Sequence, residues 1–421
     1  MPTSKGKTLY VGGTGEGNYT MIQDAIDNAS DDDTIFVYDE GSPYYENVKI
    51  DKSITLIGED RNTTVIDGGG SRNVILINVD RVTIFGFTLR NGEWGICIWF
   101  SNCNILSSNK IYENVYSGIH AKKSSYNKII NNSIYLNTRG IWFEFGEEAE
   151  YNLISNNIIS NNQYGIEYIG TYSEISKNKI TNNTKVGIFL FSPGWLPCKY
   201  NIITRNNISN NKYGIEIYSY CKNNFVYHNK FINNFMNAKA NESYYNKWDN
   251  GKSGNYWYNY TGKDKDGDGI GDTPYIICTN NIDNFPLMEP YGGFDPDAPD
   301  APEINGPSRG KPGTKYDYTF STIDPNNDDV YYYISWGDTT YEEWIGPYGS
   351  GEEVTINHTW KELSTYIITA QAKDINGLVG PEECKLVTIP RSSTTYKPLT
   401  IWLIERFPLL EVFLRAINLL R

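Results

Sequence analysis

The sequence predicts an all-β protein whose main unit is a right-handed parallel β-helix. A Gly-Ile pair recurs six times at intervals of 22 to 27 residues, and an Asn-x-Ile-x-x-Asn unit stands before five of the six pairs. A repeat near 22 residues that is rich in Asn, Gly and β-branched side chains disfavours helices and fits one coil of three short strands. The pairs begin at Gly95, Gly118, Gly140, Gly165, Gly187 and Gly214.

Stacked coils place equivalent residues about 4.8 Å apart. The isoleucines then form columns inside, so Ile119, Ile141 and Ile166 are expected in one interior row. The asparagines form ladders whose amides hydrogen-bond along the axis, and Asn also tolerates the left-handed conformation that a sharp turn needs. The usual crossover rule makes the coil right-handed.

Residues 33–100 contain less regular strands that we interpret as earlier coils of a unit spanning residues 8–290. An open end of such a stack is a sticky edge. Residues 20–29 are predicted to cover it as a helix with Thr20 as its N-cap. Its apolar face consists of Met21, Ile22, Ala25, Ile26 and Ala29.

Three further segments are predicted after residue 290: a linker, a β-sandwich and a helical tail. A stiff Pro-rich linker over 291–302 precedes alternating strands over 303–390 that predict a small β-sandwich. Residues 391–421 are predicted to form an amphipathic helical tail, which Pro408 and four charged residues interrupt. The tail is too polar to span a bilayer, and we expect it to dock on another domain or partner rather than on a membrane surface.

Composition excludes several functions. The net charge of −13 and the lack of a basic segment argue against nucleic-acid binding. Six Cys without a Cys-x-x-Cys pair indicate neither a disulfide scaffold nor a zinc site. Three His and four Met are few for a soft-ligand copper site. No 18-residue apolar run predicts a transmembrane segment.

Several Asn-x-Ser/Thr sequons and an immediate start on structured sequence suggest an exported protein whose signal is missing from this sequence. The expected location is extracellular or on the cell surface. Chance sequons in an Asn-rich chain are the alternative interpretation.

An acidic loop near residue 270 predicts a structural calcium site. Its oxygens fall at positions 1, 3, 5, 7 and 9 of a calcium-binding loop, but position 12 is Tyr275 rather than Glu. Asp283 is therefore our candidate for the missing ligand, and a solvated acidic turn is the alternative. The predicted ligands are Asp264, Asp266, Asp268, Ile270 (through its carbonyl), Asp272 and Asp283.

The residues after each Gly-Ile pair predict a ligand-binding face, because Ile points inward and the next residue points outward. Insertions at 147–150 and 192–197 are expected to wall the same face. Aromatic rings beside carboxylates suit sugar rings, which offer a flat C–H face and hydroxyls. The predicted binding residues are Trp99, His120, Trp142, Phe189, Phe191, Trp195, Glu216 and Tyr218.

Two glutamates on this face predict possible catalysis. Glu144 and Glu167 lie on neighbouring coils with an offset of two positions, hence about 8 Å apart. That separation lies within the range of roughly 6.5–9.5 Å for inverting glycosidases. The alternative is a mixed surface that packs on the sandwich or on a second subunit, since the sequence lacks the motifs of known β-helix enzymes.

Two cysteines predict a disulfide. Cys198 and Cys221 each stand three residues before a ladder asparagine on successive coils, so their Cα atoms are expected about 5 Å apart. Free thiols in a buried ladder are the alternative.

The segments Tyr19–Ile26, Gly254–Tyr260, Asp264–Tyr275 and Asn284–Pro290, together with the coils, resemble NosD-type right-handed β-helix proteins over residues 8–290. The resemblance implies that fold, and the family is grouped with carbohydrate-binding and sugar-hydrolase β-helices. It is named for a maturation factor of a copper enzyme, a role that the scarce His and Met match poorly. Residues 303–390 resemble PKD-like, immunoglobulin-type modules of surface proteins.

We therefore predict a secreted or cell-surface protein that binds polysaccharide or glycan, in an adhesive and non-catalytic role. One alternative is a glycan-cleaving enzyme that uses Glu144 and Glu167. Another is a structural subunit that assembles with itself, or with a surface-layer partner, through this face and the tail.

Overall fold

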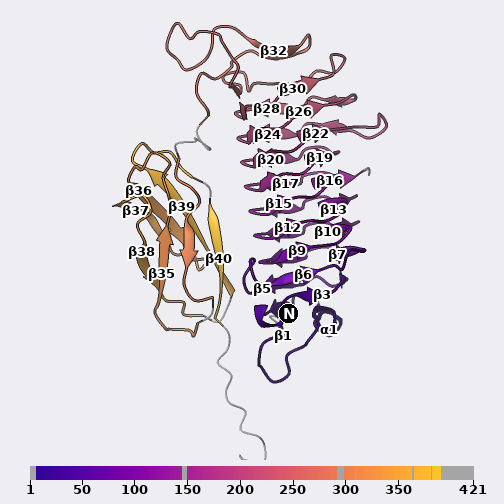
Figure 1. The fold of residues 1–421 in the computed structure, drawn as a ribbon, viewed down its shortest axis with the longest axis vertical. Helices are drawn as coiled ribbons and strands as arrows, with labels where there is room; N and C mark the ends of the chain where they lie inside the picture. The colour runs from indigo at the N-terminus through magenta and orange to yellow at the C-terminus, as the bar shows by residue number, and fades with distance from the viewer. Residues whose placement is uncertain are drawn as a thin grey trace, which may run out of the picture.

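The computed structural model describes residues 6–144, 149–291, 298–308, 310–362, 365–380 and 382–389. Three long parallel sheets form a right-handed β-helix (Figure 1). The stack confirms the predicted class and the earlier coils, which supply seven of its strands between residues 34 and 85.

Within the described residues, sheets A and B have ten strands each and sheet C has nine. Sheet A contains β1 (Thr8–Val11), β2 (Thr34–Val37), β5 (Thr55–Gly58), β8 (Thr83–Phe85), β11 (Ile105–Ser107), β14 (Lys128–Ile130), β17 (Leu153–Ser155), β20 (Glu174–Ser176), β24 (Ile202–Thr204) and β28 (Phe225–Tyr227). Sheet B contains β3 (Tyr44–Tyr45), β6 (Val65–Asp67), β9 (Thr88–Arg90), β12 (Lys110–Tyr112), β15 (Ser133–Tyr135), β18 (Ile158–Ser160), β21 (Lys179–Thr181), β25 (Asn207–Ser209), β29 (Lys230–Ile232) and β31 (Tyr256–Trp257). Sheet C contains β4 (Val48–Ile50), β7 (Asn73–Ile77), β10 (Trp94–Trp99), β13 (Ser117–Lys122), β16 (Arg139–Glu144), β19 (Tyr164–Tyr168), β22 (Val186–Leu190), β26 (Tyr213–Ile217) and β30 (Met236–Ala240).

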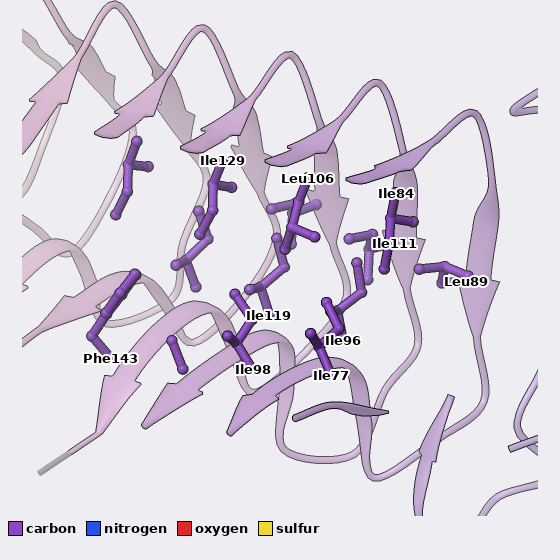
Figure 2. Close-up of a cluster of buried hydrophobic side chains, with 14 of the residues drawn as sticks. Ile77, Ile84, Leu89, Ile96, Ile98, Leu106, Ile111, Ile119, Ile129 and Phe143 are labelled. Atoms are coloured by element: carbon purple, nitrogen blue, oxygen red, sulfur yellow. The ribbon is translucent and has the colours of Figure 1, made fainter. Parts of the chain in front are cut away.

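The isoleucines of the Gly-Ile pairs form one buried row, as the repeat predicts. Ile96 and Ile119 are register partners, and so are Ile119 with Ile141 and Ile141 with Ile166. All are fully buried. Figure 2 shows apolar side chains from several coils pointing into the shared interior.

The glycines of these pairs are needed for close approach rather than for a left-handed backbone. A Cβ built on Gly140 would lie 2.5 Å from the Gly165 carbonyl oxygen and 2.7 Å from a methyl group of Ile159. Each pair thus brings the backbones of neighbouring coils together where a side chain does not fit.

The asparagine ladders form as predicted, with a fixed direction. The backbone N–H and the side-chain amide of Asn132 both donate to Oδ1 of Asn157, at 2.9 and 3.0 Å. Asn157 repeats both bonds to Asn178 on the next coil. In the bonds between these ladder asparagines, the donor therefore belongs to the earlier coil and the acceptor to the later one.

The left-handed residue at each turn is the one before the ladder asparagine, which corrects the predicted role. Asn131 and Asn156 have φ near +57°, whereas the next residues, Asn132 and Asn157, are not left-handed. Asn serves both positions of these doublets, because one asparagine tolerates the turn and the other fills the ladder.

The predicted N-terminal helix is short. Helix α1 (Ile22–Asp27) buries Ile22, Ala25 and Ile26 in the same core as the first coils. The N-cap residue is Met21 and not Thr20. The carboxylate of Glu46 replaces a local cap by accepting the N–H groups of Ile22 and Gln23, at 2.8 and 3.0 Å. A 3₁₀ turn, η1 (Asp39–Gly41), lies between β2 and β3.

At the C-terminal end of the coil, two asparagine ladders end on a hairpin of β32 (Tyr275–Cys278) and β33 (Asn281–Asp283). Asn281 accepts the backbone N–H of Asn246 and the indole N–H of Trp248. Asp283 accepts the backbone N–H of Asn255. The hairpin therefore completes the hydrogen bonding of the last coils.

Two antiparallel sheets follow and enclose a separate aromatic core that includes Tyr318, Trp336 and Trp360. One sheet contains β34 (Glu303–Asn305), β35 (Tyr316–Ser321) and β38 (Val354–His358), and the other contains β37 (Tyr341–Tyr348), β36 (Val330–Ser335), β39 (Thr365–Asp374) and β40 (Glu383–Thr388). The predicted tail, 391–421, lies outside the described residues, as does part of the predicted linker.

The sandwich lies beside the sheet A side of the coil, and the strands of sheet C lie on the opposite side (Figure 1). Arg61 of the coil pairs with Glu383 of β40 at 3.4 Å. Next to this pair is a cavity of about 330 Å³, lined by Phe85 and Ser108 from the coil and by Ile304 from the sandwich. In the described part of the chain, no helix has the length and apolarity needed to cross a membrane.

Candidate functional site: the outer face of sheet C

Four of the predicted binding residues, His120, Trp142, Phe189 and Glu216, lie in one column on sheet C. Successive register partners run from Cys97 on β10 to Glu216 on β26. The column consists of Cys97, His120, Trp142, Glu167, Phe189 and Glu216. A second column at the strand ends begins with Trp99, Lys122 and Glu144.

His120 lies at the centre of a polar and aromatic cluster. Its imidazole stacks between the indoles of Trp94 and Trp142, with ring centres 5.5 and 4.6 Å away. Nε2 lies 3.0 Å from a carboxylate oxygen of Glu144, and Nδ1 lies 3.6 Å from the sulfur of Cys97.

His120 does not lie open to a ligand, contrary to the sequence prediction. Only 2% of the residue is exposed, because Trp94 and Trp142 cover the ring. Sequence analysis missed Trp94. It stands two residues before the inward Ile96, so strict alternation would point it into the core, and the alternation breaks at Gly95, where a Cβ would meet the interior Ile111.

Burial keeps the central groups neutral. It lowers the pKa of His120, although the Glu144 carboxylate opposes the shift. It also raises the pKa of the Cys97 thiol to about 12. Both changes reflect the cost of removing a charge from water.

Polar atoms around His120 lack partners among the described residues. The indole nitrogens of Trp94 and Trp142 and the hydroxyl of Ser117 are buried without a hydrogen bond. Such groups are rare in folded proteins and mark places where a polar network is incomplete.

Each of the two proposed catalytic glutamates is already paired with cationic or hydrogen-bonding groups. Glu144 lies 3.0 Å from His120 and 3.4 Å from Nζ of Lys122. Glu167 is buried and accepts Nε of Arg139 at 2.5 Å. The Arg139 guanidinium also covers the Trp142 ring at 4.4 Å.

The C-terminal half of the face carries a second aromatic group. Phe191 lies 5.7 Å from Phe189 and 5.7 Å from Tyr218, measured between ring centres. Tyr218 is 47% exposed, and Trp195 in the loop after β22 is 76% exposed. Glu216 is bound by Lys239 at 2.6 Å. Of the other predicted loop, Glu147 and Glu148 lie outside the described residues.

A row of exposed tyrosines escaped the sequence analysis. Tyr126, Tyr151, Tyr172 and Tyr200 stack on consecutive turns, with ring centres 5.1 to 5.4 Å apart. Each precedes a ladder position and has a positive φ. Their shared place before the ladder residue was the signal that could have revealed them.

The acidic loop gathers three of its predicted ligands. Carboxylate oxygens of Asp264, Asp266 and Asp268 lie within 4.8 Å of one another. Asp268 raises the pKa of Asp266 by charge repulsion. Asp272 accepts the N–H of Lys265, and Ile270 pairs with Leu287 in an isolated bridge.

Asp283 does not belong to this loop, so its predicted role as a calcium ligand is wrong. It is fully buried at the end of a ladder, where it accepts the backbone N–H of Asn255 and the indole N–H of Trp257. Its burial raises its pKa to about 6. The ladder spacing could have revealed this position, which follows Asn255 in the same row.

Cys198 and Cys221 are register partners in short strands β23 (Cys198–Lys199) and β27 (Cys221–Lys222), but both are free thiols. The predicted disulfide is therefore not formed. Parallel neighbours point the same way and keep their Cβ atoms about 4.8 Å apart, whereas a disulfide needs about 3.8 Å.

A family model described as "Periplasmic copper-binding protein (NosD)" matches residues 26–262, which is more than half of the chain. The chain belongs to this NosD family. The match covers all the coils that carry the outer face of sheet C. A search of curated proteins finds no match.

Similar solved structures include two polysaccharide enzymes, which fix neither the activity nor the ligand of this NosD-family chain. An alginate lyase from Paenibacillus sp. str. FPU-7 is 15% identical and covers 59% of this chain and 97% of its own, with a TM-score of 0.38. The A-module of mannuronan C-5 epimerase AlgE6 from Azotobacter vinelandii is also 15% identical, covering 55% and 93%, with a TM-score of 0.29.

A third similar structure is the PKD domain of an M14-like peptidase from Thermoplasmatales archaeon SCGC AB-540-F20. It is 50% identical and covers 23% of this chain and 98% of its own, with a TM-score of 0.22.

Copper in the NosD description makes the thiols and imidazoles of this chain relevant, because copper favours Cys, Met and His ligands. Among the described residues, no three such donors gather in one place. A pair does, since Cys97 and His120 are in contact at 3.6 Å. His228 and His358 bind Ser253 and Asp338 elsewhere. The donor chemistry therefore fits an ion of low coordination number at Cys97 and His120.

Proposed function

We propose that this protein binds polysaccharide in a non-catalytic role along the outer face of sheet C. The observation that carries the proposal is the series of partly exposed rings on one face, at Trp99, Phe191 and Tyr218. Trp195, in the loop after β22, is proposed to add a further ring. Rings of this kind can stack on the flat C–H faces of sugars.

The spacing of these rings suits an extended chain rather than a single sugar. Trp99 ends β10, and Tyr218 follows β26, five coils later. At about 4.8 Å per coil the two rings are separated by about 24 Å along the axis. A ligand that contacts both must therefore be a polymer.

The face is also free of the sandwich, whose contacts through Arg61 and Glu383 lie on the side of sheet A (Figure 1). Charged groups on it are mostly paired, as in Arg139 with Glu167 and Lys239 with Glu216. Such ion pairs can form hydrogen bonds with sugar hydroxyls while the face keeps little net charge.

The ion pairs of Glu144 and Glu167 also favour polysaccharide binding over polysaccharide cleavage. A glycosidase needs one carboxylic acid and one free carboxylate base. Here Glu144 lies between His120 and Lys122, and Glu167 is held by Arg139. Cleavage remains the alternative. Release of reducing ends from a polysaccharide, abolished in Glu167→Gln, would establish it.

Binding is tested by affinity electrophoresis through gels containing neutral or acidic polysaccharides. Trp99→Ala and Tyr218→Ala should each weaken retardation roughly tenfold, as expected for loss of one aromatic contact. Tyr126→Ala, which removes a similarly exposed ring from the turn row, is the matched control and should bind normally. Equal binding by all three variants would move the site off this face, and no binding by the wild type would end the proposal.

A structural subunit is the third possibility, and the same samples address it. Concentration-dependent assembly without sugar, measured by light scattering, would favour a self-assembling surface protein. We place the protein outside the cytoplasm, in line with the periplasmic description of its family.

Copper binding is a second candidate function, favoured by the contact between Cys97 and His120. The family description names this metal, and a thiol beside an imidazole is a donor pair that copper accepts. Titration of the reduced protein with Cu(I) against a chromogenic chelator tests it directly. A wild type that takes no copper from the chelator would exclude it.

Calcium is proposed as a structural ion of the acidic loop. The proposal is supported by the carboxylate oxygens of Asp264, Asp266 and Asp268, which lie within 4.8 Å of one another; their repulsion raises the pKa of Asp266, and a bound cation would relieve it. Calcium should raise the melting temperature of the wild type but not that of Asp266→Ala. Asp51→Ala, which changes an exposed carboxylate in the first coils, should respond like the wild type.

A further inference from the structure

Cys97 and His120 meet because the coil stack holds them in register. They are partners on β10 and β13, and both are buried. Their positions are therefore set by two backbones with regular hydrogen bonds rather than by a loop. The sulfur and Nδ1 lie 3.6 Å apart.

We propose that the Cys97 sulfur and the His120 Nδ1 together bind one Cu(I) ion, with Glu144 as the residue that positions the imidazole. The inference rests on the second candidate function and assigns its site. Nothing in the family description identifies these residues.

The tautomer of His120 is suited to this role. Glu144 lies 3.0 Å from Nε2, and when Nε2–H donates a hydrogen bond to this carboxylate, the lone pair of Nδ1 faces the Cys97 sulfur. Histidines that ligate metals commonly donate their other ring N–H to a carboxylate in this way. Glu144 in turn is held by Lys122 at 3.4 Å.

The separation of the two donors is close to that of a shared ion. Bonds from zinc to sulfur and nitrogen of about 2.3 and 2.0 Å sum to about 4.3 Å, so an ion of similar size would bridge two atoms 3.6 Å apart in a bent arrangement, and a linear one would need the donors to separate by about 0.7 Å. On binding, the thiol gives its proton to the buffer and the sulfur forms the bond to copper. No electron is transferred.

The donor pair selects a soft ion. Thiolate and imidazole favour Cu(I), whereas calcium and magnesium prefer oxygen ligands. The two indoles that cover the imidazole keep water away from the site. A ring face is a poor ligand for a hard ion, so this enclosure adds to the selectivity.

The buried thiols of Cys198 and Cys221 are the main rival site. They also lie on neighbouring coils and would bind Cu(I) through two sulfurs. Unlike Cys97, they have no imidazole in their contact, because the described histidines bind other residues. The number of sulfur ligands therefore separates the two sites.

The test is a Cu(I) titration of the full chain under anaerobic conditions, with competition by a chromogenic chelator. The wild type should bind one ion at this site. Cys97→Ser and His120→Gln should each lose roughly 100-fold or more in affinity, and Glu144→Gln should lose roughly 10- to 100-fold. Cys103→Ser, which removes an exposed thiol just beyond β10, should be unchanged.

Copper-edge X-ray absorption of the wild type gives a readout that needs no variant. One sulfur and one nitrogen ligand support the site. Two sulfurs, or loss of binding in Cys198→Ala but not in Cys97→Ser, would overturn the site and leave copper binding intact. If the wild type binds no Cu(I), both the site and the second candidate function fail.

Discussion

The asparagine ladders and the outer face of sheet C follow the same coils but are held differently. Each ladder asparagine, such as Asn157, bonds to backbone groups of other coils and to the next asparagine. On the outer face, each coil has a different partner, such as the indole pair around His120 or Arg139 beside Glu167. Positions held by backbone geometry repeat in the sequence, whereas positions held by neighbouring side chains do not.

The largest expected effect comes from breaking a ladder. Asn157→Ala removes an acceptor for Asn132 and a donor to the carbonyl of Ile129, all inside the coil. Unsatisfied buried groups cost about 1–3 kcal/mol each, so the free energy of unfolding should fall by about 3–5 kcal/mol. Urea denaturation followed by circular dichroism measures it.

Asn161→Gly is the matched control for that change. Asn161 is an exposed left-handed residue with φ of 56°, a conformation that glycine adopts freely. Its stability should stay within about 0.5 kcal/mol of the wild type. Equal losses in both variants would contradict the distinction between ladder and turn asparagines.

Asp283, the last acceptor of a ladder, should make the stability of the protein depend on pH. The pKa of Asp283 is about 6 in the folded protein and 3.8 in its ordinary range, so between these values only the folded state keeps the proton. Its contribution is therefore full below about pH 4 and is lost as the pH rises through 6, by roughly 2–3 kcal/mol.

Melting temperatures of the wild type and Asp283→Asn at pH 4 to 7 test this dependence. The wild type should lose stability relative to the variant as the pH increases. A constant difference between the two proteins would show that the carboxyl group does not titrate in this range.

A smaller loss is expected where the coils approach most closely. Gly140→Ala places a methyl group against the Gly165 carbonyl and should destabilise the protein by about 2 kcal/mol. Gly349→Ala in the sandwich meets only one atom, at 3.5 Å, and should change stability by less than about 0.5 kcal/mol. Thermal unfolding of both variants decides whether the Gly-Ile repeat reflects this contact.

The smallest effect is expected on the outer face. Trp99 is 39% exposed, and its ring contacts the ammonium group of Lys122 at 4.7 Å and the ring of Phe100 at 5.5 Å. Trp99→Ala should therefore cost less than about 1 kcal/mol of stability, while polysaccharide binding weakens. A loss as large as that of Asn157→Ala would make the ring a structural element and weaken the proposed function.

The coil stack and its interior could be predicted from the sequence because backbone contacts impose the repeat. The row through Ile119, Ile141 and Ile166 is an example. Asp283 ends a ladder, and the same repeat spacing predicts this place. The sequence analysis names it as a calcium ligand instead, because its carboxylate matches the missing ligand of the acidic loop. The position of Asp283 in the repeat is therefore a better guide to its role than its chemical type.

The candidate site was only partly predictable. Alternation placed His120 and Trp142 in one column, but it did not reveal that Trp94 from the adjoining column covers the imidazole. Likewise, the scarcity of His and Met argued against copper, although two donors one coil apart can meet. Such contacts depend on side-chain conformations, which spacing does not determine.

The one-way direction of the ladders bears on biosynthesis. As each coil leaves the ribosome, it adds acceptors for the coil below and presents fresh amide donors of its own. Until Asn281 and Asp283 are made, two rows of donors at the growing end remain unsatisfied. A nascent chain halted before this hairpin would therefore expose an open coil end that can pair with another unfinished chain. The hairpin prevents such pairing at this end of the finished coil.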